Sequence, residues 1–395
     1  MPEVTESRFR YGAWYALAGF VCIRTLVILT ALWSVWGLEP PETAPWWSDV
    51  PLVRWDSAYY MEIVREGYRA DAEIPHTVAF FPLYPLSARL LTPWLKPDAA
   101  LVVVSNLAAV LGAVFLYLWA RKLAGPRAAL GATLLAASYP PAMFLAAGYT
   151  EGLFFLEVAV ALWLLCRGRD LPAACVSGLA TATRPTGLVL AMVVWMCALT
   201  RGRPAGRRRR WPRLLAIGLL SISGFLAYQA FLWSRYDRPD AFLVVQKHWP
   251  AKEVGHPWVR MLTLQPVLEG SIRPIKYAVR GEFGRLAEPW TWNPLLLLLV
   301  LATAAAGLIK PGKVPRLLFL LPIIIFLVGY VPGMGGLSRF NAMARYQVVA
   351  LPCFLLWANW RPIRNHRVVF VTLIAALVLL QCVFARAFAN WQWAG

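Results

Sequence analysis

The sequence has little charge: of its 395 residues only 15% are Asp, Glu, Lys or Arg, whereas 59% are hydrophobic. A soluble globular domain carries about 25% charged residues, so this composition excludes an ordinary soluble enzyme. Apolar runs of about 17–25 residues, the length that crosses a ~30 Å hydrocarbon core, recur along almost the whole chain. We therefore predict an all-α polytopic membrane protein without a β-sheet.

Several motifs that would indicate other chemistry are also absent. The sequence has no GxGxxG, Walker A or zinc motif, so nucleotide hydrolysis and zinc chemistry have no support. It has no dense Asp cluster for a metal ion and no convincing internal repeat of the kind that transporters show. No cleavable signal peptide is expected, because the first apolar run, 14–36, is too long. The six cysteines lack metal-ligand spacing and are interpreted as small buried hydrophobes.

The formal net charge is +19, and most of the basic residues lie in short linkers beside the apolar runs. They lack the interleaved aromatic residues of a surface that binds nucleic acid. Nucleic acid is therefore not an expected partner. The positive-inside rule places these linkers in the cytoplasm and predicts about eleven transmembrane helices, with the N-terminus inside and the C-terminus outside. Apart from the segment 171–200, the expected spans are 14–36, 100–119, 128–147, 152–166, 213–234, 292–309, 316–333, 346–360 and 368–389.

Two long loops, 37–99 and 235–291, should then both face outward. They are rich in Trp, Tyr and Pro and alternate short apolar and charged stretches, as helices that lie in the membrane interface do. Long structured loops on one side of a membrane protein usually build a site. We expect the functional site at this outer end.

The segment 171–200 has basic flanks on both sides, so both of its ends should be cytoplasmic and the segment should form a short helical hairpin. Its break is expected at Thr183-Arg184-Pro185-Thr186-Gly187, because proline removes a helix hydrogen bond and biases Arg184 away from helical geometry. Arms of about twelve residues rise only about 18 Å, which would hold Arg184 at membrane depth. This cation either meets an anionic substrate group, snorkels to lipid phosphates, or bonds carbonyls freed by Pro185.

The first outer loop carries the strongest catalytic candidate. Asp56, in Arg54-Trp55-Asp56-Ser57-Ala58-Tyr59-Tyr60, begins a short amphipathic helix at the membrane surface. It is either a helix cap or the general base that sugar transfer requires to deprotonate an acceptor hydroxyl. Glu151, at the outer end of a span, either complements the dipole of the following helix or belongs to the site.

Other candidates are basic or polar residues near the outer mouths of helices, where a phosphate can be bound. Arg24 and Glu157 fall within spans, where charge is costly, and we expect them to pair with each other or with other polar groups. The candidates for binding the donor phosphate or substrate are Arg54, Tyr60, Glu151, Arg184, Gln246, Lys247, His248 and Arg345.

At these residues the sequence resembles the PIG-V family of mannosyltransferases, and specifically its bacterial members. The resemblance spans most of the chain and implies a single GT-C transmembrane domain over 1–395, with a catalytic Asp in the first outer loop that Asp56 matches. It also implies a polyprenyl-phosphate-mannose donor and a lipid or glycolipid acceptor. The tip Arg184-Pro185-Thr186-Gly187 departs from the Arg-Ser-Asn-Gly-like sequence of the eukaryotic branch, so the acceptor stays open. The motifs that carry the resemblance are, in order, Arg54-Trp55-Asp56, Gly67-Tyr68, Ala79-Phe80-Phe81-Pro82-Leu83-Tyr84-Pro85, Tyr149-Thr150-Glu151, Thr183-Arg184-Pro185-Thr186-Gly187 and Arg345-Tyr346.

Together these features predict an inverting mannosyltransferase of the cell membrane, surrounded by membrane lipids and active outside the cytoplasm. No cofactor is expected besides the lipid-linked donor, and no metal is required if basic groups face the leaving phosphate. Two other classes stay open. A flippase for a lipid-linked sugar would also show many helices and a buried Arg, and a non-catalytic assembly subunit would need no base.

Overall fold

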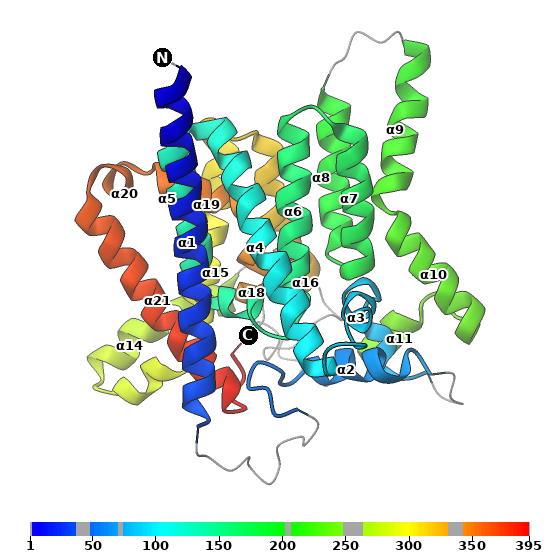
Figure 1. Cartoon of the computed structure of the whole chain (residues 1–395), viewed down its shortest axis with the longest axis horizontal. Helices are drawn as coiled ribbons and strands as arrows, with labels where there is room; N and C mark the ends of the chain where they lie inside the picture. Colours follow the sequence, from blue (N-terminus) through cyan, green and yellow to red (C-terminus); the bar gives the residue numbers. More distant parts are fainter. Residues whose placement is uncertain are drawn as a thin grey trace.

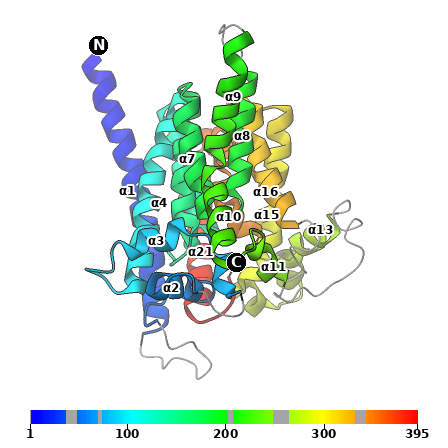
Figure 2. The same cartoon turned by 90° about the vertical axis from the view of Figure 1, so that its right-hand side faces the viewer.

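The structure is a computed structural model, and it describes residues 2–36, 48–69, 74–201, 207–247, 264–330 and 343–394. Within these ranges every regular element is a helix, which confirms the all-α prediction. Figures 1 and 2 show a bundle of long helices with short helices gathered at the end opposite the N-terminus.

Four helices in the described ranges are long and apolar enough to cross a membrane, and they belong to α1 (Pro2–Ser34), α4 (Pro97–Ala124), α15 (Pro289–Ile309) and α21 (Arg367–Ala389). The pair α9 (Arg207–Ser221) and α10 (Ser223–Tyr236) passes the same test together but is bent by 56°. These findings support a multi-pass membrane protein. The larger count of about eleven spans stays a prediction, because the remaining helices are shorter than the ~20 residues that cross a bilayer alone.

The centre of the bundle is built from shorter helices that pack against the long ones. α4 contacts α5 and α6, α6 contacts α7, α7 contacts α8 and α9, and α1 contacts α5 and α21. Close approach of α4 and α6 depends on glycine: a Cβ on Gly152 would lie 2.2 Å from the Ser105 carbonyl oxygen. The shorter helices are α5 (Pro126–Ser138), α6 (Glu151–Cys166), α7 (Asp170–Thr183), α8 (Gly187–Thr200), α16 (Leu320–Tyr330) and α19 (Leu351–Asn359).

Three of the expected spans are interrupted in the structure. The span predicted at 128–147 stops at Ser138, because Pro140 and Pro141 follow, and continues as the 3₁₀ helix η2 (Pro140–Leu145). The span predicted at 213–234 is bent between α9 and α10. The span predicted at 346–360 is divided into α18 (Met343–Tyr346), η5 (Gln347–Val349) and α19. Two of these breaks meet, since α18 contacts η2 inside the bundle.

The two long loops contain most of the remaining short helices. Figures 1 and 2 place α2, α3, α11, α13 and α14 at one end of the bundle, whereas the last residues of α8 and the start of α9, with its run of arginines, lie at the other end. This arrangement agrees with the prediction that both loops build one end of the molecule. The helices within the two loops are α2 (Ser57–Glu66), η1 (His76–Ala79), α3 (Leu83–Arg89), α11 (Ala241–Lys247), α13 (Gln265–Ser271), α14 (Arg273–Val279) and η3 (Phe283–Ala287). Two further short helices, η4 (Arg316–Phe319) and α20 (Arg361–Asn365), come later in the sequence and lie outside these loops.

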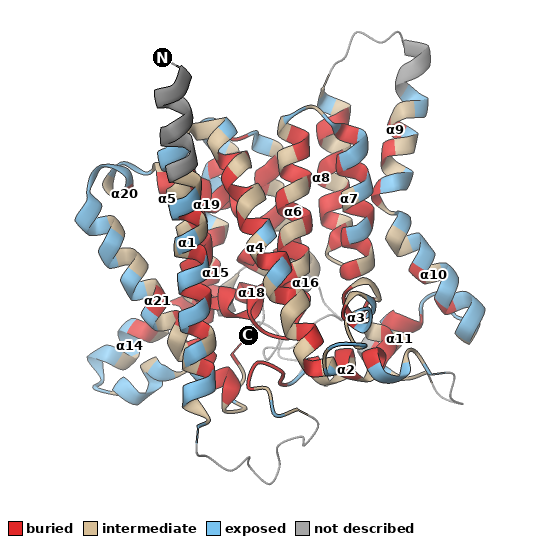
Figure 3. Ribbon diagram, viewed as in Figure 1, coloured by how far each residue is buried: buried red, intermediate tan, exposed pale blue. Residues whose placement is uncertain are grey.

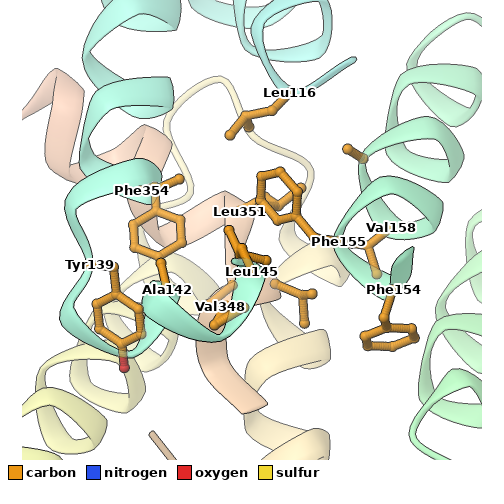
Figure 4. Packing of buried hydrophobic residues seen from close by; sticks show 14 of the residues in the cluster. Leu116, Tyr139, Ala142, Leu145, Phe154, Phe155, Val158, Val348, Leu351 and Phe354 are labelled. Carbon is orange, nitrogen blue, oxygen red and sulfur yellow. The ribbon is translucent and has the colours of Figure 1, made fainter. Parts of the chain in front are cut away.

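Buried residues concentrate where the central helices face one another, and exposed apolar residues lie on the outside, as expected for a chain in lipid (Figure 3). One apolar cluster runs through most of the bundle. Figure 4 shows its packing beside η2, where Tyr139, Phe155 and Phe354 gather. The interpretation of all six cysteines as buried is wrong for Cys22 and Cys175, which are exposed.

Candidate active site

Asp56 stands directly before α2 but does not cap it. Its backbone has helical dihedral angles, φ −58° and ψ −20°, and its side chain makes no capping hydrogen bond. The carboxylate therefore does not stabilise the start of α2, and the Asp56 side chain is 34% exposed. This geometry favours a role in the site over the capping role that the sequence left open.

Tyr149 holds the Asp56 backbone in place. The Asp56 N–H donates to Tyr149 Oη at 3.2 Å, and the Tyr149 hydroxyl donates to the Arg54 carbonyl oxygen at 3.1 Å. Tyr149 is almost fully buried. It lies just before α6, so these two hydrogen bonds join the turn of the first loop to the α6 end of the bundle.

Two arginines and two carboxylates meet beside this turn. Arg345 Nη1 lies 3.7 Å from Asp56 Oδ2, and Arg345 Nε lies 3.2 Å from Glu151 Oε1. The same Glu151 oxygen accepts from Arg184 Nη1 at 3.1 Å. Asp56, Arg345, Glu151 and Arg184, called here the charge chain, thus connect the first loop to the hairpin tip.

Each member of the charge chain lies at a point where a helix begins or breaks. Glu151 is the first residue of α6, and Arg184 has an extended backbone between α7 and α8, next to Pro185. Arg345 lies in the four-residue helix α18, which the Tyr139 hydroxyl holds through the Ala344 carbonyl oxygen at 3.0 Å. At these breaks, charged side chains from different helices come together inside a bundle that is otherwise hydrophobic.

Aromatic rings surround both guanidinium groups. The Arg345 guanidinium carbon lies between 5.0 and 5.6 Å from the ring centroids of Phe144, Tyr149, Tyr346 and Trp393. Arg184 lies 4.8 Å from the Tyr346 ring and 5.4 Å from the Phe154 ring. Cation–π contacts of this kind hold a cation in a site from which water is largely excluded. Arg345 is the more enclosed of the two, with a side chain 6% exposed against 12% for Arg184.

The surroundings of Asp56 raise its pKa. Burial of the carboxyl group among neighbouring side chains raises the pKa most, the Arg345 guanidinium lowers it, and the negative charge of Glu151 raises it further. The net result is a pKa above the ordinary value for Asp. A base whose pKa moves toward neutral pH accepts a proton more readily in a transition state.

The other predicted site residues differ in their placement. Arg54 is buried and donates to the carbonyl oxygens of Ser48, Val50, Val53 and Ala389, which favours a structural role over the predicted ligand role. Tyr60 is buried in α2 near Glu151, and its hydroxyl bonds with the Thr150 side chain. The backbone of Gln246 and Lys247 belongs to α11, while their side chains and all of His248 lie outside the described residues.

Arg24 and Glu157 pair with other polar groups and not with each other. Arg24 donates to the carbonyl oxygen of Ala137, near the end of α5, and to that of Ala142, within η2. Glu157 accepts from the Thr183 hydroxyl at 2.7 Å, so it braces the last turn of α7 just before Arg184.

Sequence reasoning missed the C-terminal residues of the site. Trp391 and Trp393 follow α21, and their rings pack against Trp55, the residue before Asp56. The only sign of these residues in the sequence is that two tryptophans lie two positions apart, near the end of an apolar run. Among the described residues, no three His, Cys, Asp or Glu side chains gather as metal ligands would.

Comparisons with known proteins identify relatives of this chain. Residues 46–258 match the family model described as mannosyltransferase (PIG-V). GPI alpha-1,6-mannosyltransferase 2 of Rattus norvegicus is 35% identical over 171 residues, which cover 38% of this chain and 34% of that protein. The Homo sapiens protein of the same name is 32% identical over 150 residues, covering 35% and 30%. The matched stretch is thus well under half of the length of either relative.

A solved structure that can be superposed on this chain is the oligosaccharyltransferase of Archaeoglobus fulgidus in complex with Zn and sulfate. The superposition covers 94% of this chain and 53% of that chain, with 15% sequence identity and a TM-score of 0.45. The apo form of the same protein gives 14% identity and a TM-score of 0.43. Both are distant likenesses.

Proposed function

This chain belongs to the PIG-V family of mannosyltransferases, and from that premise we propose that it transfers mannose from a polyprenyl-phosphate carrier to a hydroxyl of a lipid-linked or glycolipid acceptor. The reaction takes place at the extracytoplasmic face of the membrane, inverts the anomeric centre, and belongs to a GT-C-type enzyme. Asp56 is the general base.

The observation that carries this proposal is the charge chain. A partly exposed carboxylate with a raised pKa lies 3.7 Å from one buried guanidinium and shares the site with a second one. Sugar transfer from a phosphate carrier needs a base for the acceptor and positive charge for the leaving group. The charge chain offers both within a single site.

The proposed reaction is a single displacement. Asp56 takes the proton of the acceptor hydroxyl while that oxygen forms a bond to C1 of the mannosyl group. The bond between C1 and the phosphate oxygen breaks on the opposite face, and polyprenyl phosphate leaves with the bonding electrons. Attack from the face opposite the leaving group inverts the configuration at C1.

The two arginines have different roles in this scheme. Arg345 is nearly enclosed and paired with two carboxylates, so it tunes and orients Asp56. Arg184 is more exposed and stands at the hairpin tip, where it would meet the donor phosphate. Glu151 keeps both guanidinium groups in place. Because arginine already supplies positive charge at the leaving group, the proposal includes no metal ion and no cofactor.

The assignment of the active site to the extracytoplasmic side rests on where the basic residues lie. The arginine-rich start of α9 lies at the end of the bundle that carries the N-terminus, and the first-loop helix α2 lies at the other (Figure 1). The positive-inside rule assigns the arginine-rich end to the cytoplasm. The charge chain, which includes the residue before α2, is then near the outer surface.

Asp56→Asn tests the base directly. Purified protein in detergent is incubated with polyprenyl-phosphate-mannose carrying a radiolabelled sugar and with a membrane lipid extract. We expect turnover to fall by about 10²–10⁴-fold, the usual effect of removing a general base. The matched control is Glu62→Gln, which neutralises a carboxylate in α2, the helix that follows Asp56, outside the charge chain. Wild-type turnover in Asp56→Asn would refute the assignment of the base.

The same assay separates the enzyme from the flippase. A wild-type protein that transfers no label to any lipid, yet moves the labelled donor across the membrane of reconstituted vesicles, would refute the proposed function. A protein that does neither would favour a non-catalytic assembly subunit.

A further inference from the structure

Trp55 has a strained backbone beside the proposed base. Its φ of 55° lies in the left-handed region, which large side chains rarely adopt. Such strain persists only where surrounding structure enforces it, most often at functional sites. Although held in this way, the Trp55 side chain stays 37% exposed. This backbone conformation therefore leaves the large ring of Trp55 partly exposed next to Asp56.

The segment after α21 supplies the other side of this aromatic surface. The Trp55 ring lies edge to face with Trp391, at 6.1 Å and 60°, and with Trp393, at 5.5 Å and 82°. Trp391 has a left-handed backbone too, with φ 60°, which turns the chain back toward the first loop.

Several contacts attach this segment to the charge chain and its surroundings. The Arg54 guanidinium lies 4.8 Å from the Trp391 ring and donates to the Ala389 carbonyl oxygen at 3.2 Å. Trp393 lies 5.6 Å from the Arg345 guanidinium, which itself contacts Asp56. The three tryptophans thus contact one another and the arginines around Asp56, and two of them lie outside the part of the chain that matches the family model.

We propose that Trp55, held by Trp391 and Trp393, is a platform that stacks against the pyranose ring of a substrate. A hexopyranose has one face rich in C–H bonds of partial positive charge, which complements the negative face of an indole ring. Polar groups that fix orientation, here the charge chain, are then adjacent to an apolar surface that fixes position, as in sugar and ligand sites generally. The ring is that of the mannosyl donor or of a sugar on the acceptor.

This inference rests on the proposed function, and its test separates the two. Trp55→Leu keeps apolar bulk and the same backbone strain but removes the ring, whereas Trp55→Phe keeps a ring. We expect Trp55→Leu to raise KM for the stacked substrate by roughly 3- to 10-fold, about 0.7–1.4 kcal/mol at 1.4 kcal/mol per tenfold, and Trp55→Phe to restore most of that affinity. KM is measured for donor and acceptor separately, so the substrate whose value rises is the one that stacks.

The control is Trp94→Leu, which removes a tryptophan that is 78% exposed elsewhere in the first loop. Its KM values should equal those of the wild type. If Trp55 only packs the C-terminal segment in place, Trp55→Leu will lower the melting temperature and leave both KM values unchanged, and the platform is then refuted.

A direct binding measurement covers the case in which the wild type shows no transfer. Saturation-transfer NMR with methyl α-mannopyranoside and the detergent-solubilised protein reports ring protons that touch the protein. Saturation in the wild type that is lost in Trp55→Leu and kept in Trp94→Leu supports the platform, whatever the fate of the transferase proposal. No saturation in the wild type, or equal saturation in Trp55→Leu, overturns it.

Discussion

Glu151→Gln is the substitution that tests the charge chain most sharply. The Glu151 side chain is 2% exposed, and one of its oxygens pairs with both Arg184 and Arg345, at 3.1 and 3.2 Å. Glutamine has the same shape and can still accept one hydrogen bond, but it carries no charge. The substitution therefore removes the carboxylate that both guanidinium groups share. Among the described residues, Arg345 then keeps its ion pair with Asp56, and Arg184 has no other ion pair.

The expected loss of stability follows from this geometry. Breaking a buried ion pair by removing one partner typically costs about 3–5 kcal/mol, because the remaining charge stays buried. Asp56 compensates Arg345 in part, so we expect a value near the lower end, about 3 kcal/mol. The measurement is thermal unfolding in detergent. Glu157→Gln is the matched control. Glu157 lies in the same helix and is buried, but among the described residues it forms no ion pair, and the hydrogen bond that it accepts from Thr183 can also be accepted by glutamine.

Glu151→Gln should also change the pH dependence of transfer. Asp56 acts as a base only when ionised, so kcat/KM rises with pH through the pKa of this carboxyl group. The Glu151 charge raises that pKa and the Arg345 charge lowers it. Removing Glu151 eliminates the first effect and leaves the second, so the pKa of Asp56 must fall. The acidic limb of the kcat/KM profile should therefore move to lower pH.

Two results would contradict this reasoning. A melting temperature for Glu151→Gln equal to that of Glu157→Gln would mean that the ion pairs contribute no stability. An acidic limb that stays in place or moves to higher pH would mean that Glu151 does not act on the base, and the assignment of Asp56 would lose its electrostatic support.

Three further predictions concern neighbouring parts of the site and the orientation of the chain. Arg184→Lys keeps the charge but loses the planar fork, so donor affinity should weaken by roughly 1–3 kcal/mol in a donor titration; unchanged affinity with a lower melting temperature would assign Arg184 to structure. Tyr149→Phe removes both hydrogen bonds of the hydroxyl: the Asp56 N–H loses this acceptor, whereas the Arg54 carbonyl oxygen still accepts from the Ser57 N–H. The loss should cost about 1–3 kcal/mol in thermal unfolding, and wild-type stability would show that these hydrogen bonds are dispensable. With the six native cysteines replaced, Lys313→Cys should react with an impermeant reagent only from the cytoplasm and Gly284→Cys only from outside; labelling of both from one side would overturn the proposed orientation.

The sequence alone determined the helical class and the location of the main features. Hydrophobic content and run length indicate helices in lipid, because an apolar run of about 20 residues matches a spanning helix that satisfies its own backbone, whereas a spanning strand is about half as long. Pro185 indicated the break at the hairpin tip, since proline has only local effects and these can be read from local sequence. The sequence placed Asp56 at the start of an amphipathic helix and Glu151 at the outer end of a span. It placed Arg184 at the break of the hairpin and Arg345 near the outer mouth of a helix.

Only the tertiary structure decided which of these charges meet. Arg24 and Glu157 both looked like partners because each lies in a span, yet they bond to different groups. Arg345 reaches Asp56 and Glu151 because the proline-broken end of α5 and the short helix α18 come together, and Trp393 reaches Trp55 because the chain turns back after α21. Periodicity and hydropathy specify which face of a helix is buried. They do not specify the helix it packs against, because that choice depends on the shape and crossing of all neighbouring helices at once.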